Sequence, residues 1–184
     1  MPTPIPFMML PMSIFRLAST ASLVSGVLVC AFVAAAQAAP SDPDRFITSI
    51  YANGREPKVW AEWLDGARRP EWFSHALTTL WARCDARAHK NGDELGPVDF
   101  DVSTNSQGME VKSFTVKTLS QDASRASVVA RLAPNNWVRK SERENEIRYD
   151  LVWEHGRWAI DDIHSVAEPT AWSLRSILTL YLSN

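Results

Sequence analysis

The feature that most restricts the fold is a pair of alternating segments near the C-terminus. Apolar residues occupy every second position from Ile147 to Trp153 and again at Trp158 and Ile160, on either side of His155-Gly156. Side chains two apart in a strand lie on one face of a sheet. Two such runs joined by a tight, glycine-containing turn predict a β-hairpin with one buried face. Other elements of the chain must therefore cover that face.

Two segments upstream show the same alternation. Residues 126–132 have apolar side chains at the even positions. In residues 109–119, Met109 and Val111 fall at odd positions, whereas Phe114 and Val116 fall at even positions. A regular pleat cannot bury both sets, so we expect a β-bulge near Ser113. Together with the hairpin, these segments predict four antiparallel strands.

The first half of the domain has helical rather than strand periodicity. We expect a helix capped by Ser41 and stopped at Gly54, and a short second helix between Pro57 and Gly66. The longest helix should open at Pro70, run to about residue 90 and end at Asn91-Gly92. A last helix should be capped by Thr170. The buried stripe of the longest helix is expected to contain Phe73, Ala76, Leu77, Leu80, Cys84 and Ala88.

Helices first and strands later predict an α+β fold with an antiparallel sheet. The N-terminal helices should pack on one face of a curved, four-stranded sheet, followed by the short C-terminal helix. A bulge that increases the curvature of the sheet would produce a cone with a cavity between sheet and helices.

The N-terminus has the composition of a secretory signal peptide. Arg16 is its one charged residue, and an apolar run ends in Ala36-Gln37-Ala38. We expect cleavage after Ala38, a periplasmic or secreted location, and a single domain over residues 39–184. A retained membrane anchor is the alternative, although the apolar run is short for a membrane span. Met12 offers a more ordinary start than Met1.

Charge and cysteine content exclude several classes of partner and cross-link. All acidic residues and all basic residues except Arg16 follow position 38, so the mature chain is slightly negative. Such a chain has no strong attraction for nucleic acid or anionic membrane, and we expect it to meet the membrane only transiently, through its signal peptide. Cys30 follows Val29, which does not suit lipidation, and Cys84 alone remains for the mature chain. No internal disulfide is possible, and Cys84 should be buried.

The last strand contains the best candidates for acid–base chemistry. If Trp158 and Ile160 face the core, Asp162 and His164 share that face by the period of a regular strand. A carboxylate and an imidazole inside a cone could act as an acid–base pair. The alternative is that the strand ends or bulges near Asp161, which leaves Asp162 and His164 solvated or paired with arginine.

A second candidate is the run Asp99-Phe100-Asp101. Its two carboxylates could flank a pocket or bind a cation, or they could accept backbone N–H groups in a turn that Phe100 anchors in the core. The ligand count for a metal site is too small, and no cofactor motif is present, so we expect neither metal nor cofactor. The tryptophans Trp60, Trp63 and Trp72 are expected either to pack in the core or to form a surface for a partner. The residues expected to line a pocket are Asp99, Asp101, Tyr149, Trp153, Trp158 and Asp162.

Four short runs carry a family resemblance over nearly all of residues 44–181. They are Gly96-Pro97-Val98-Asp99-Phe100-Asp101, Asn105-Ser106-Gln107, Trp158-Ala159-Ile160-Asp161-Asp162-Ile163 and Ser173-Leu174-Arg175-Ser176-Ile177-Leu178. These runs resemble the DUF3828 family of small bacterial envelope proteins. The resemblance implies a fold like that of nuclear transport factor 2 (NTF2-like) and no particular reaction. Gly108 stands where the family pattern often has Asp.

These observations favour a non-enzymatic envelope domain that binds a small ligand or a protein partner. One alternative is an NTF2-like enzyme of the isomerase, dehydratase or hydrolase type, using Asp162 and His164 in the cone. Another alternative is a periplasmic immunity-type protein that presents the segment Asn135 to Asn145 to a toxin.

Overall fold

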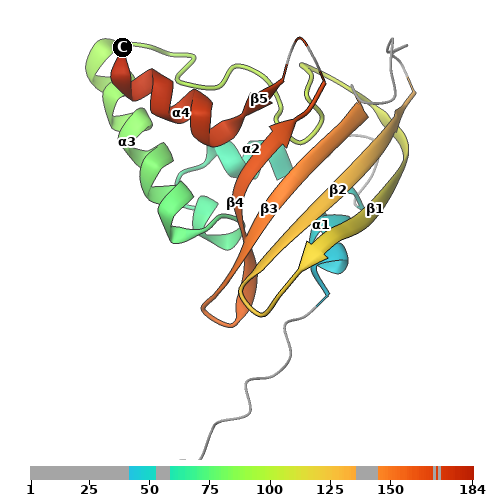
Figure 1. Ribbon diagram of the computed structural model, residues 1–184. Coiled ribbons are helices and arrows are strands. Elements are labelled where there is room, and N and C mark those ends of the chain that lie inside the picture. The colour runs from blue at the N-terminus through green and yellow to red at the C-terminus, as the bar shows by residue number, and fades with distance from the viewer. Residues whose placement is uncertain (1–41, 53–58, 136–144, 168, 170) are drawn as a thin grey trace, which may run out of the picture. The chain divides into compact units, whose positions relative to one another are not determined.

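The computed structural model describes residues 42–52, 59–135, 145–167, 169 and 171–184. All of them fall within one unit of the chain, Gln37–Asn184. Their architecture is α+β, with helices first, then a sheet, and a short helix at the C-terminus (Figure 1). The α+β class expected from the sequence, with an antiparallel sheet and a short C-terminal helix, is confirmed.

The sheet is antiparallel and has one strand more than expected. Its strand order is β1-β2-β3-β4-β5, and every neighbouring pair runs antiparallel. The predicted hairpin is present, and His155 and Gly156 both take positive φ (53° and 77°) in its turn. The fifth strand has only two residues and pairs with the end of β4. The strands are β1 (Val111–Gln121), β2 (Arg125–Pro134), β3 (Glu146–Glu154), β4 (Arg157–Ser165) and β5 (Trp172–Ser173).

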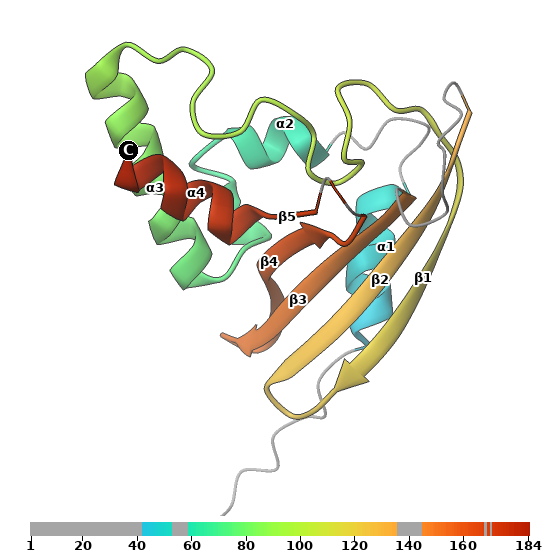
Figure 2. The ribbon, with the colours of Figure 1, turned by 45° about the horizontal axis from the view of Figure 1, so that its top comes forward.

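The helices leave one face of the sheet open. The views in Figures 1 and 2 place α1 behind the sheet, and α3 and α4 beside the β4 edge. The buried side chains of β2, β3 and β4, such as Val128, Tyr149 and Ile160, form the core with those of α1 and α3. The helices are α1 (Pro43–Tyr51), α2 (Val59–Leu64), α3 (His75–Asn91), α4 (Leu174–Ser183) and a 3₁₀ turn η1 (Arg69–Glu71).

The start of the longest helix differs from the expectation. Pro70 belongs to η1, and α3 begins only at His75, where the Ser74 side chain accepts a hydrogen bond from the Leu77 N–H. The residues between η1 and α3 pair with β4 instead: Ser74 N donates to Ile160 O at 2.8 Å, and Ile160 N donates to Trp72 O at 2.9 Å. This tertiary pairing holds the segment extended and delays the helix.

The face of α3 that is buried also differs in part. Leu77, Trp81, Cys84 and Ala88 are buried, whereas Ala76 is exposed. The predicted C-terminal stop is confirmed, because Gly92 ends the helix in the left-handed conformation with φ 68°. Such a conformation is most accessible to glycine.

The N-terminus of α1 is capped by Asp42, whose side chain accepts from Asp44 N. The cap of α4 is Ser173, so the predictions of Ser41 and Thr170 as helix caps are wrong. Gly54 and Pro57, which were predicted to bound helices, lie outside the described residues, as do the signal peptide and most of the Asn135 to Asn145 segment. Among the helices of the described residues, none combines the length and apolar character of a membrane span.

The predicted bulge near Ser113 is confirmed. The pairing of β1 with β2 shifts register between Val111 and Ser113, so that Val111 and Phe114 both turn toward the helices. The β1–β2 pairing shifts register again between Thr118 and Ser120. A further shift, in the pairing of β3 with β4, decides where the candidate acid–base residues lie.

Candidate functional site

A β-bulge at Asp161 separates the two halves of β4. Asp150 of β3 pairs with Asp162, but the next residue, Leu151, pairs with Ile160, so Asp161 has no residue opposite it. An extra residue of this kind reverses the parity of the strand beyond it. Ile163 is therefore buried opposite Tyr149, and Asp162 and His164 do not share the inner face with Trp158 and Ile160. The expectation of an acid–base pair inside a cone is corrected, and the alternative of a bulge near Asp161 is the one observed.

The Asp162 carboxylate binds the first turn of α4. Its Oδ1 accepts from the Arg175 N–H at 3.0 Å and from the Ile163 N–H at 2.9 Å. Its Oδ2 accepts from the hydroxyl of Ser173 at 2.7 Å, and that hydroxyl caps α4. A carboxylate at a helix N-terminus is favoured by the helix dipole. The hydrogen bonds of Asp162 therefore hold α4 and the bulge in place, and they occupy the oxygens that proton transfer would need.

The Asp161 carboxylate connects the other two elements. Its Oδ1 accepts from the Ser74 hydroxyl, the cap of α3, at 2.6 Å. It also forms an ion pair with Arg175, whose Nε donates to the Asp161 carbonyl at 2.6 Å. The bulge thus presents two consecutive carboxylates that tie the N-termini of α3 and α4 to β4.

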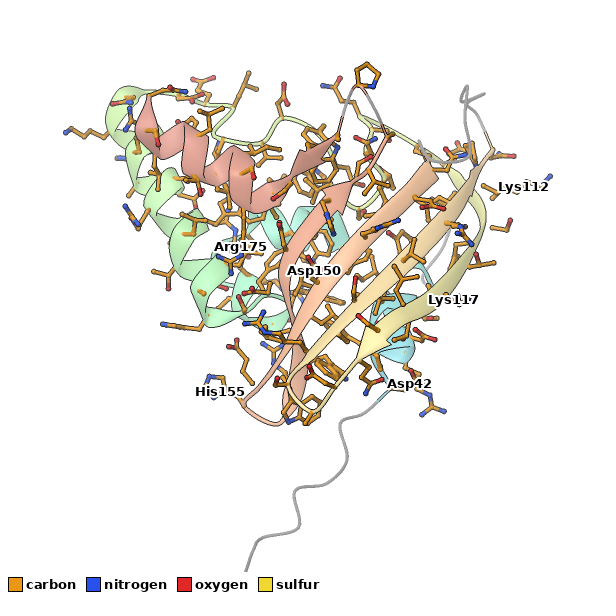
Figure 3. All side chains as sticks on the ribbon, viewed as in Figure 1. Asp42, Lys112, Lys117, Asp150, His155 and Arg175 are labelled. Carbon is orange, nitrogen blue, oxygen red and sulfur yellow. The ribbon has the colours of Figure 1, made fainter. Side chains whose placement is uncertain are left out.

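These residues line a groove on the open face of the sheet. The groove has a volume of about 420 Å³ and runs from the β1–β2 turn across β3 to the start of α4. Figure 3 shows Asp150 on β3 and Arg175 at the start of α4, on the side away from α1. This volume falls within the range of small-molecule sites, about 300–1,000 Å³. Its polar lining includes Arg125, Ser127, Asp150, Asp161, Asp162 and Arg175.

The polar groups of the groove differ in how far the protein already uses them. Asp161 and Asp162 are held by the contacts above, whereas the Asp150 side chain is 48% exposed and, among the described residues, its one ionic partner is His164, with Nε2 3.5 Å from its Oδ2. The exposed guanidinium of Arg125 makes no hydrogen bond to any described residue, although its charge lies near Asp122, another residue of the groove, and helps to lower the pKa of that carboxyl. Asp150 can therefore still accept hydrogen bonds from a polar ligand, and Arg125 can still donate them.

The run Asp99-Phe100-Asp101 forms a turn, as one of the two alternatives foresaw. Asp101 Oδ1 accepts from the N–H and the hydroxyl of Ser103, both at 2.7 Å, and Phe100 packs edge-on against Trp172 at 5.1 Å between ring centroids. Asp99 is exposed. Burial raises the pKa of Asp101 above its usual value, although its hydrogen bonds act in the opposite direction.

Tyr149 lies beside this turn, in contact with a residue that the sequence did not single out. Its hydroxyl is 2.6 Å from that of Tyr51, and Tyr51 donates to the carbonyl of Ser103 at 2.7 Å. Burial raises the pKa of both tyrosines well above the ordinary value. Asp101 and Tyr149 are thus brought together, as expected of pocket residues, but the contacts they make fix a loop onto the core.

The tryptophans of the last hairpin and the helices are mainly packing residues. Trp153 and Trp158 meet edge-on with centroids 5.2 Å apart, and Trp158 is fully buried. Trp63 is also fully buried, and it contacts Trp72, which is partly exposed like Trp60. These contacts favour the core role over a partner surface for Trp63.

Cys84 is buried beneath α4, as expected, and its thiol donates to the Leu178 carbonyl at 3.3 Å. Burial raises the pKa of this thiol to about 11. Within the described residues, no cluster of histidine, cysteine and carboxylate side chains has the makings of a metal site. The residues that sequence reasoning missed are Ser74, Arg125, Asp150 and Arg175, since their proximity depends on contacts between elements far apart in the chain.

A comparison of the chain with protein-family models, with curated proteins and with solved structures found no match.

Proposed function

We propose that this chain is an exported protein of the bacterial envelope whose domain binds a small polar ligand or a polar segment of a partner protein in the groove of the open sheet face. The observation that carries the proposal is the groove itself, with the exposed side chains of Asp150 and Arg125. Two exposed, opposite charges in a groove of this size are typical of a site that orients a ligand by hydrogen bonds.

A binding role is favoured over a catalytic one by the use that the fold makes of Asp162. Three donors bind its carboxylate, and the bulge turns it away from the apolar core. His164 meets Asp150 at 3.5 Å on the same outer side. The arrangement therefore gives no support to an enzyme that uses these two residues inside a cone.

The proposal includes membership of the DUF3828 family and an NTF2-like, cone-shaped fold. What supports it is the packing of helices on one face of an antiparallel sheet, together with the Asp-Phe-Asp and Trp-x-Ile-Asp-Asp-Ile runs. The Asp-Phe-Asp run forms a loop tied to β5 through Trp172, and the second run contains the bulge. Each motif thus has a defined structural role in this domain.

Ligand screening with a groove variant tests the binding role. A library of small polar molecules, including amino acids, sugars, polyamines and carboxylic acids, is added to the protein while its melting temperature is recorded. We expect a stabilising hit that Arg125→Ala or Asp150→Asn weakens at least about tenfold, which equals the loss of one good hydrogen bond. The control is Arg45→Ala, an exposed arginine of α1, which should leave the affinity unchanged. A ligand whose affinity is unchanged in both groove variants would overturn the assignment of the site.

Export is tested separately, because the groove could bind a ligand in any compartment. We expect a mature chain that begins at Ala39 in the periplasmic or secreted fraction of an expressing Gram-negative cell. An uncleaved chain, or one confined to the cytoplasm, would contradict export and would leave the proposal of the binding site unaffected.

A further inference from the structure

We propose that α4 is a latched helix: the Asp161–Asp162 pair holds its first turn against β4, and loss of this latch lets α4 open as a unit and uncovers Cys84. The latch is defined here as Asp161, Asp162, Ser173 and Arg175. Opening of this kind is a conformational device separate from global unfolding, and it does not depend on the proposed function.

The latch bonds are concentrated at one end of the helix. The Ser173 hydroxyl and the Arg175 N–H both donate to Asp162, while the Arg175 side chain pairs with Asp161 and donates to its carbonyl. Hydrogen bonds to charged groups are stronger than neutral ones. One pair of neighbouring carboxylates on β4 therefore supplies most of the polar attachment of the first turn.

The remainder of α4 is attached mainly by apolar packing. Leu174 and Leu178 are fully buried, and Ile177, Tyr181 and Leu182 are partly buried against the core. Its last turn is also held by the hydroxyl of Tyr181, which donates to Asp93 at 2.6 Å, and by Arg87, which donates to Leu182 O at 3.0 Å. A helix at a chain end opens at lower free energy than the central strands, so the polar bonds of its first turn carry weight in holding it closed.

Opening of α4 has a specific chemical consequence. The Cys84 thiol is fully buried, and it donates to the carbonyl of Leu178 on the buried side of α4. When α4 opens, this hydrogen bond is lost and the Cys84 thiol becomes exposed to solvent. A thiol reagent therefore reports the opening of α4.

The position of the latch also suggests how the device is controlled. Asp161, Asp162 and Arg175 line the groove as well as forming the latch. A ligand seated there would contact the latch, and it would shift α4 toward whichever state it binds better. Regulation of α4 opening by a groove ligand rests on the proposed function, whereas the latch itself does not depend on it.

The test is the rate at which N-ethylmaleimide modifies Cys84 in the full chain under native conditions, read by peptide mass spectrometry so that Cys30 is distinguished. We expect Asp162→Ala to raise the rate at least about tenfold, from the loss of hydrogen bonds to a charged acceptor. Arg175→Gln should raise it by a smaller factor. The matched control is Asp42→Ala, which removes the carboxylate that caps α1 instead of α4 and should change the rate less than about twofold.

A second measurement separates local opening from general destabilisation. Hydrogen exchange of the β2 and β3 amides, such as those of Val128 and Ile147, should be unchanged in Asp162→Ala while the α4 amides exchange faster. The proposal is overturned if Cys84 is modified no faster in either latch variant. It is also overturned if the exchange of β3 rises in parallel with that of α4, since the whole domain then opens together. Loss of groove binding with an intact latch would count against the proposed function alone.

Discussion

The hydroxyl of Tyr149 lies 2.6 Å from the hydroxyl of Tyr51, and Tyr51 donates to the carbonyl of Ser103 at 2.7 Å. A carbonyl can only accept, so the one proton of Tyr51 is committed to Ser103. Tyr149 must then be the donor within the pair. This order of protons makes the two hydroxyls unequal, although both are buried.

We predict that Tyr51→Phe is more destabilising than Tyr149→Phe. Removing the Tyr51 hydroxyl leaves both the Ser103 carbonyl and the Tyr149 hydroxyl without a partner, which costs about 2–3 kcal/mol. Removing the Tyr149 hydroxyl deletes a donor and leaves the bond from Tyr51 to Ser103 in place, at a cost of about 1 kcal/mol. Urea denaturation of the two variants measures the difference. Equal destabilisation, or a larger effect of Tyr149→Phe, would contradict the proposed direction of the hydrogen bonds from Tyr149 to Tyr51 to Ser103.

Alkaline pH provides a second prediction, because the three tyrosines of the chain all have raised pKa values. The hydrogen bond from Tyr181 to Asp93 raises the pKa of Tyr181 to about 12, and burial raises those of Tyr51 and Tyr149 further. The folded state therefore keeps protons that the unfolded chain releases near pH 10. This contribution to stability is complete below pH 10 and is lost as the pH rises toward 12 and beyond.

Ultraviolet absorbance of phenolate measures this directly. The folded protein should show little ionised tyrosine at pH 10.5, where the chain in urea is more than half ionised. Tyr181→Phe serves as the control, because it removes the first step near pH 12 and leaves the other two tyrosines. A normal titration near pH 10 in the folded protein would contradict the burial of the pair.

The regular parts of the sheet were predictable because they depend on local periodicity. The hairpin turn at His155-Gly156, the even-position core of residues 126–132 and the bulge near Ser113 follow from which side chains must be buried. The start of α3 was not predictable in the same way. Pro70 is a good first residue of a helix, and only the pairing of Trp72–Ser74 with β4 shows why the helix begins later.

The position of the candidate site residues depends on Asp161. The sequence alone could not decide whether Asp161 continues a regular strand or is the extra residue of a bulge. Trp158, Ile160, Asp162 and His164 fit a regular pleat, and the same residues fit a bulge at Asp161. The burial of Ile163 opposite Tyr149, a long-range contact, selects the bulge. Arg125 and Asp150 were missed for the same reason, since only the assembled open face brings them into one groove.

A double-mutant cycle tests whether Ser74 and Asp161 act together. Ser74→Ala removes the cap of α3 and should cost about 1 kcal/mol. Asp161→Ala should cost about 1–2 kcal/mol, since its partner Arg175 is partly exposed. With the 2.6 Å bond between them, the double variant should be less destabilised than the sum by about 0.5 kcal/mol or more. Strict additivity would show that the bond contributes nothing. Ser49→Ala, an exposed serine of α1, provides the control.

The hairpin turn offers a prediction about backbone conformation. His155 and Gly156 have φ of 53° and 77°, so both occupy the left-handed region. Gly156→Ala should cost about 1 kcal/mol, because alanine is strained there, although the structure leaves open space around the position. His155→Asn should be neutral or stabilising by a few tenths of a kcal/mol, because asparagine tolerates this region better. Thermal unfolding of both variants measures the two changes in stability. An unchanged stability of Gly156→Ala would contradict the left-handed conformation of this turn.

Binding of a ligand in the groove of the open sheet face can be tested most directly by amide NMR spectra of the protein, recorded with each hit from the polar-molecule screen. We predict chemical-shift changes concentrated at Arg125, Ser127, Asp150 and Asp162 that saturate with ligand concentration and vanish in Arg125→Ala. Saturable shifts centred instead on Asp101 and Tyr149 would contradict it and would place the site on the helix-covered side.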